Sequence, residues 1–246
     1  MPQYRGVTIQ NLCIKLANAE TENEVIQLLK SASLWDNPKY WRDFGDNENN
    51  FATIGNQQSR PEAAIVEKII NSVDAVLMAS VMSKGIDPES GKAPQSIKEA
   101  LETFFEIPEG KLSNCSAAKI TKLADSIAFV ASGAKSKPCY SIIDKGEGQT
   151  PKKMPETFLS LTKSNKLRIP FVQGKFNMGG TGVFQFCGKR NLQLIISKRM
   201  PEISKSESDP TKDKWGFTII RRDVPQEGVK SSVYRYLAQN NEIMAL

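Results

Sequence analysis

The chain's 246 residues, 39% of them hydrophobic and 24% charged, are typical of a soluble globular protein. Its 33 basic and 27 acidic residues leave a net charge of +6, which suits a phosphate-bearing partner but is modest for a dedicated nucleic-acid binder. The absence of histidine excludes Ser-His-Asp, Cys-His and histidine acid/base catalysis, and the four cysteines have no zinc-site spacing.

The sequence predicts neither a membrane span nor a signal peptide. The chain contains no run of 18 apolar residues, so no membrane span is expected. The N-terminus lacks the apolar core and cleavage site of a signal peptide. We therefore expect a cytoplasmic protein with reduced cysteines, or a nuclear one if the source is eukaryotic. Residues 231–246 end without a clear cap or polar tail, which suggests that the natural chain continues.

Hydrophobic periodicity predicts a mixture of helices and strands. The predicted helices cover residues 8–17, 22–32, 61–82, 96–105, 116–123 and 153–161. The predicted strands cover residues 126–131, 139–144, 191–197 and 216–221, and the first two form a hairpin. Thr21 is the expected cap of the second helix, and residues 183–187 are an expected helical turn.

Two further stretches have no regular pattern. Residues 35–60 are rich in Asn, Asp and aromatic side chains, and we expect an ordered loop that packs over the body through its rings. A strap that reaches a partner subunit is the second interpretation. Residues 198–214 carry prolines and many charges, which predicts a solvated loop.

The order of elements predicts one α+β domain. Residues 1–59 are expected to pack as N-terminal helices and a strap on a body that comprises residues 60–246.

The long helix carries the first functional signal. Glu67, Asn71 and Asp74 share one stripe at 3.6-residue spacing, and apolar residues cover most of the rest. Only a narrow strip around Lys68 and Ser72 is expected to face water. An acid, an amide oxygen and a second acid within two turns fit the floor of a metal–nucleotide site. Taken alone, the pattern favours a core helix with a few polar residues at its edge.

Asp144, Gly146 and Gly148 follow a predicted strand in a DxGxG pattern. A carboxylate at a strand end can accept a hydrogen bond from an exocyclic amine, while glycines let a planar base approach the backbone. Asp and Gly also end strands for purely structural reasons, and the fragment alone favours that interpretation.

The segment Gly179-Gly180-Thr181-Gly182 precedes an apolar helical turn. Unhindered backbone N–H groups at a helix start favour phosphate, although a flexible glycine turn explains the composition equally well. The spacing to Gly188-Lys189, and Arg190 in place of Ser/Thr, exclude a P-loop, and the dinucleotide GxGxxG pattern is also unmatched.

The three patterns in this order resemble the GHKL ATPase superfamily of gyrase, heat-shock chaperone, histidine kinase and MutL, which has the Bergerat fold. The resemblance covers residues 60–222 and is nearest in motif style to the chaperone and MORC branches. It implies a two-layer sandwich with a mixed or antiparallel sheet covered on one face by helices. It also implies an ATP lid at residues 150–173 and, because the first two motifs lie far apart, an inserted helical segment at residues 94–107.

The resemblance also implies residue roles, with ATP and Mg²⁺ as cofactors. Glu67 would orient and deprotonate the attacking water, Asn71 would hold Mg²⁺, and Asp74 would shape the pocket. Asp144 would recognise the adenine amino group. The other implied nucleotide-binding residues are Gly146, Gly148, Lys163, Ser164, Lys175, Asn177, Met178, Gly179, Gly180, Thr181, Gly182 and Thr218.

Two positions depart from the family pattern. Asn177 stands where the chaperone and MORC branches usually carry glycine, and Thr218 matches only loosely the threonine that often touches the adenine-binding aspartate.

The leading functional hypothesis is a slow, Mg-dependent ATPase whose lid closure drives dimerisation or interdomain movement. The expected partners are a second copy or a downstream domain that supplies a basic residue, with nucleic acid as a further candidate and no membrane. The alternatives are a histidine-kinase-type phosphotransfer domain and a nucleotide-sensing or DNA-binding module that does not hydrolyse ATP. DNA repair and defence assemblies are among the settings that use such modules.

Overall fold

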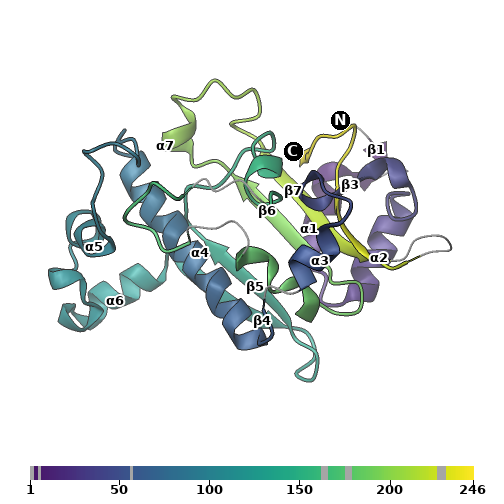
Figure 1. Ribbon diagram of the computed structural model, residues 1–246, viewed down its shortest axis with the longest axis horizontal. Coiled ribbons are helices and arrows are strands. Elements are labelled where there is room, and N and C mark those ends of the chain that lie inside the picture. The colour runs from purple at the N-terminus through teal and green to yellow at the C-terminus, as the bar shows by residue number, and fades with distance from the viewer. Residues whose placement is uncertain (1–2, 5–6, 56–57, 162–165, 175–178, 226–230) are drawn as a thin grey trace.

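The computed structural model describes residues 3–4, 7–55, 58–161, 166–174, 179–225 and 231–246. As predicted, it is an α+β protein, in which α-helices accompany antiparallel sheets (Figure 1). Within the described ranges, no helix combines the length and the apolar character needed to cross a membrane.

The α-helices agree with the predicted ones over most of the chain. They are α1 (Ile9–Ala17), α2 (Glu22–Ser31), α3 (Asn50–Gly55), α4 (Pro61–Met82), α5 (Ile97–Phe105), α6 (Ala117–Ala124) and α7 (Pro201–Ser204). Thr8, Thr21, Ser96 and Ser116 cap α1, α2, α5 and α6 by accepting a backbone N–H from the first turn, which confirms the predicted role of Thr21.

Short 3-10 turns lie between the helices and strands. They are η1 (Pro38–Tyr40), η2 (Phe44–Asp46), η3 (Pro108–Gly110), η4 (Leu112–Asn114), η5 (Met154–Glu156), η6 (Gly179–Thr181) and η7 (Phe184–Phe186).

The largest sheet is antiparallel throughout. Its strands β3 (Trp41–Asp43), β8 (Val233–Leu237), β7 (Trp215–Asp223) and β6 (Gln193–Lys198) lie in that order, and β9 (Met244–Ala245) also pairs with β7. Strands β1 (Gln3–Tyr4) and β2 (Val7–Thr8) form a separate pair. Strands β4 (Ile127–Ser132) and β5 (Cys139–Asp144) form the predicted hairpin, with Ile127 opposite Asp144.

Both faces of the large sheet are buried. Phe217 and Ile219 point to one face, where they pack in a cluster with Leu12 of α1 and Leu29 of α2. Ile220 points to the other face and packs with residues of η2, α3, η5 and η7. Helices α1 and α2 therefore cover one face, and α3 and three short turns bury the other.

The predicted packing of residues 35–60 through aromatic rings is confirmed for Trp35, Trp41 and Phe44, which are buried. The guanidinium of Arg221 lies 3.7 Å from the ring centroid of Trp41, which places a cation over the aromatic face. The stretch is more regular than expected, because β3 joins the large sheet by pairing with β8.

Helix α4 lies against the β4–β5 hairpin instead of the large sheet (Figure 1). Its C-terminal half packs with α5 and with Ile169 and Phe171. Because the two-stranded hairpin is narrow, it leaves Val66 and Val73 at 53% and 37% exposure, so the prediction that apolar residues bury this helix nearly all round was wrong there. Ser72, predicted to face water, is only 5% exposed because it faces Asp144 on β5.

Two other predicted segments differ from the structure. The helix expected at residues 153–161 was wrong, because only the single turn η5 forms there. The segment is held in place by its buried side chains Met154 and Leu159. The loop expected at residues 198–214 contains α7 and is partly internal, with Arg199 and Ile203 buried.

Candidate functional site

Asp74 is the most deeply buried acid of the predicted stripe. It is 0% exposed, and its two carboxylate oxygens accept the backbone N–H groups of Gln173 at 2.9 Å and of Gly174 at 2.7 Å. The Lys166 ammonium lies 3.9 Å from the same carboxylate. Hydrogen bonds from two successive N–H groups compensate the burial of the charge, so Asp74 ties the end of the predicted lid to α4.

Asn71 faces the glycine-rich segment from one turn earlier on α4. A Cβ added to Gly174 would lie 2.8 Å from the Asn71 Oδ1 atom, and one added to Gly180 would lie 3.8 Å from Nδ2. Only a glycine fits at position 174 without displacing the amide. The structure therefore brings the helix stripe and the third motif together, although their sequence positions differ by about 100 residues.

Asp144 lies beside the same helix, on the opposite side of Asn71 from Asp74. Its Oδ1 atom accepts the Gly146 N–H at 2.9 Å and its Oδ2 atom accepts the Ser72 hydroxyl at 3.0 Å, while the residue as a whole stays exposed. Each oxygen keeps a lone pair, so the carboxylate can still accept a hydrogen bond from a ligand amine. Ser72 was missed as a site residue because a serine in a helix gives no sequence signal of its own.

The glycines of the second motif serve chain packing. A Cβ on Gly146 would lie 2.5 Å from the Ala75 Cβ atom, and the neighbouring Glu147 N–H donates to the Ala75 carbonyl at 3.1 Å. Gly148 has φ +59° and a Cβ there would lie 1.8 Å from the Lys198 carbonyl oxygen. These contacts with α4 and with the end of β6 are enough to explain why both positions are glycine. That the glycines also leave room for a base stays a prediction.

We expect Gly148→Ala to lower the free energy of unfolding by about 2–4 kcal/mol, since a left-handed backbone and a backbone overlap are penalised together. Urea denaturation measures the change. Gly91→Ala is the matched control, because nothing lies within 4 Å of its Cβ position, and it should change stability by less than about 1 kcal/mol. Equal stabilities of the two variants would contradict this account of Gly148.

An ion-pair network anchors the loop after β5. Arg199, whose side chain is 4% exposed, donates to Glu147 at 2.8 Å, to Glu207 at 2.8 Å and to the Gly148 carbonyl at 2.9 Å. The network joins the second motif to the segment that contains α7. Sequence reasoning assigned Arg199 to a solvated loop and so missed it.

The remaining predicted residues divide into two groups. Thr218 is fully buried in β7 and donates its hydroxyl to the Leu237 carbonyl at 2.7 Å, so it is Ser72 that supplies the hydroxyl on Asp144. Thr181 and Gly182 are buried in and just after η6, and Gly179 and Gly180 belong to that turn. The predicted residues Lys163, Ser164, Lys175, Asn177 and Met178 lie outside the described residues.

The glycine segment leads into two short turns and not into the start of an α-helix. η6 and η7 are each one turn of 3-10 helix, where the sequence predicted an apolar helical turn at residues 183–187. A single turn has little macrodipole, so any anion there would depend on local N–H groups and side-chain cations.

Lys68 supplies a cation on this side of α4. Burial lowers its pKa to about 8, and the neighbouring Cys187 and Glu67 oppose that shift only in part. Burial also raises the pKa of Cys187 to about 11, so this thiol stays protonated near neutral pH.

The donor set fits a magnesium ion that is held mainly by a nucleotide. Mg²⁺ in such sites keeps several waters and phosphate oxygens and needs one or two protein oxygens. The Asn71 amide, held against Gly174, is one such oxygen donor, and Glu67 lies one turn away on the same stripe.

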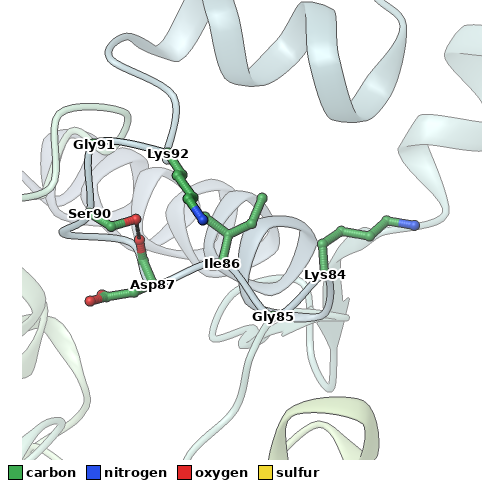
Figure 2. A pocket seen from close by; sticks show the side chains of 7 residues that line it. All are labelled: Lys84, Gly85, Ile86, Asp87, Ser90, Gly91 and Lys92. Carbon is green, nitrogen blue, oxygen red and sulfur yellow. Dashed lines mark hydrogen bonds between the residues drawn. The ribbon is translucent and has the colours of Figure 1, made fainter.

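The described residues form surface hollows away from the predicted site. One of about 620 Å³ follows the C-terminal end of α4 and is lined by Lys84, Gly85, Ile86, Asp87, Ser90, Gly91 and Lys92 (Figure 2). Another of about 430 Å³ is lined by residues of η1, β3 and η2 together with Arg235. Neither includes a predicted site residue.

Comparison of the chain with protein-family models, with curated proteins and with solved structures gave no match.

Proposed function

We propose that this chain is a Mg-dependent ATP-binding module of the GHKL type that hydrolyses ATP slowly. The observation that carries the proposal is that the second and third motifs both meet α4, which carries the first motif. Asp144 and Gly146 meet Ser72 and Ala75, while Gly174 and Gly180 meet Asn71. Such convergence is expected of a nucleotide site, because it brings polar groups from distant segments to one place.

Each side chain then has a chemical task. Glu67, half-buried on the stripe, would orient a water molecule and take its proton, and Asn71 would give an amide oxygen to the metal. The ion held there would supply positive charge to offset that of the phosphates. Asp144 would accept the adenine amine. Asp74 would keep the chain around Gly174 in position for the phosphates, through its two backbone hydrogen bonds.

The proposal extends to architecture and coupling. The α4–hairpin pair would be the nucleotide half of a Bergerat-type sandwich, with α5 in the inserted segment and residues 150–173 as the lid. Lid closure, more than chemistry, would set the turnover, and it would drive dimerisation or interdomain movement.

Calorimetric titration with Mg-ATP tests the proposal. The wild type should bind adenine nucleotides, and Asp144→Asn should bind at least about 100-fold more weakly, because the amide presents a donor to the adenine amine while the exposed position limits harm to folding. Glu67→Ala should still bind but lose hydrolysis, measured as phosphate release. If the wild type takes up no nucleotide with magnesium present, the proposal is wrong.

A further inference from the structure

Lys68 lies where α4 meets the glycine turn η6. A Cβ added to Gly180 would lie 3.6 Å from the Lys68 Nζ atom, and that nitrogen lies 5.8 Å from the ring centroid of Phe184. The ammonium is therefore held between a helix, an aromatic face and a backbone turn. Gly180 also borders Asn71, so the lysine and the proposed metal ligand face the same turn.

The surroundings of this ammonium supply little compensation for its charge. Among the described residues, Nζ forms no ion pair, Glu67 acts on its charge only from beyond ion-pair distance, and the aromatic ring gives only a weak attraction. A charged amine that is removed from water without a close counter-ion costs free energy. An anion that arrives at Gly180 would recover that cost, so the position favours an anionic ligand.

The direction along α4 identifies which part of a nucleotide would meet the lysine. Asp144, the proposed acceptor for the adenine amine, meets α4 at Ser72, whose hydroxyl donates to it. Lys68 is one turn nearer the N-terminus, about 6 Å along the helix axis, next to Glu67. Gly180 and Asn71 lie between these ends. The phosphates would run from the Asp144 end toward Lys68, which brings the terminal phosphate nearest to the ammonium.

We propose that Lys68 is the chain's own cation for the terminal phosphate of ATP and that it distinguishes ATP from ADP; this inference rests on the proposed function. The ammonium would donate hydrogen bonds to terminal phosphate oxygens above Gly180. A basic residue from another subunit or domain would then be an addition to the site and not a requirement for this discrimination.

The test compares Lys68→Met and Lys68→Arg by calorimetry with Mg-ATP and with Mg-ADP. Lys68→Met should bind ATP about 10–100-fold more weakly while ADP affinity changes by less than about threefold, because one charge-assisted hydrogen bond is lost from the terminal phosphate only. Lys68→Arg should recover part of the ATP affinity. Lys92→Met, at an exposed lysine of the hollow in Figure 2, is the control and should match the wild type.

A second readout separates phosphate contact from a structural role. At pH 8.5, Lys68 is partly neutral, and a phosphate beside it would raise its pKa from about 8. ATP binding should therefore take up protons, measured as a dependence of the binding heat on the ionisation heat of the buffer. The other titratable neighbours are Glu67 and Cys187, and the thiol, with a pKa near 11, stays protonated at this pH. Lys68→Met should abolish the uptake.

The outcomes distinguish the two proposals. Tight ATP binding with an unchanged ATP-to-ADP ratio in Lys68→Met would overturn the assignment of Lys68 and leave the ATP site intact. Absence of nucleotide binding in the wild type would overturn both. Thermal unfolding of Lys68→Met should confirm that it is folded, since the change removes a half-buried charge and keeps the side-chain length.

Discussion

Replacing Arg199 by alanine should lower the free energy of unfolding by about 3–5 kcal/mol. The guanidinium is 4% exposed and donates to Glu147 and Glu207, each at 2.8 Å. Removing it leaves Glu147, only 11% exposed, without this counter-ion, and leaves Glu207, 16% exposed, with the Lys153 ammonium at 3.3 Å. The Gly148 carbonyl loses its donor as well. Urea denaturation followed by circular dichroism measures the change in midpoint at constant slope.

Arg60→Ala is the matched control for this prediction. Arg60 also faces a carboxylate, that of Glu62 at 3.9 Å, but both side chains are more than 70% exposed. A pair in water contributes little, so the control should change stability by less than about 1 kcal/mol. A double variant, Arg199→Met with Glu207→Gln, should recover part of the loss because it removes charge on both sides. If Arg199→Ala costs no more than the control, the network does not anchor the loop.

Local signals predicted many of the regular elements correctly. The hairpin of β4 and β5 follows from two short apolar runs around a glycine and proline turn, and α2 from an apolar stripe after Thr21. These patterns depend on residues that are close in sequence, so a single chain carries the information. The same holds for the stripe of Glu67, Asn71 and Asp74 on α4.

Long-range contacts were the part that local patterns could not predict. Asn50 looks like a loop residue, yet it is fully buried and bonds the Phe44 and Tyr234 carbonyls and the Tyr234 N–H, which fixes the strap to β8. Strand β8 itself was missed. Its alternation of Tyr and Arg residues becomes meaningful only beside β7, because burial on both faces of a sheet is set by segments distant in the sequence.

In the candidate site, too, local patterns were predictable and long-range contacts were not. The sequence singled out the acids and glycines of the site, whose chemical roles stay predictions, but it did not predict that Ser72 would hold Asp144 or that Lys68 would face Gly180. Those pairings depend on the rotation of α4 against the hairpin. The roles of Gly146 and Gly148 in packing likewise depend on Ala75 and Lys198, which no spacing rule connects to them.

Replacing Asp74 by alanine should cost about 2–4 kcal/mol of unfolding free energy and should also weaken ATP binding. The Asp74 carboxylate accepts the N–H groups of Gln173 and Gly174. Alanine removes this acceptor from two N–H groups that are partly buried. The backbone around Gly174 would then lose its fixed distance from Asn71. Hydrogen exchange should show the effect locally, as faster exchange of the amides of residues 173 and 174 at unchanged protection of β7.

Asp87→Ala is the control, because Asp87 also accepts a backbone N–H, from Glu89 at 3.0 Å, but is exposed on the connector after α4. It should cost less than about 1 kcal/mol and leave exchange at residues 173 and 174 unchanged. Asp74→Asn should fall between the two, since its amide keeps one acceptor and turns a donor toward the second N–H. If Asp74→Ala loses stability without faster local exchange, the carboxylate acts through the core of α4 instead of through the glycine segment. Faster exchange together with loss of ATP affinity would instead make Asp74 the residue that couples the proposed lid to the phosphate end of the proposed site.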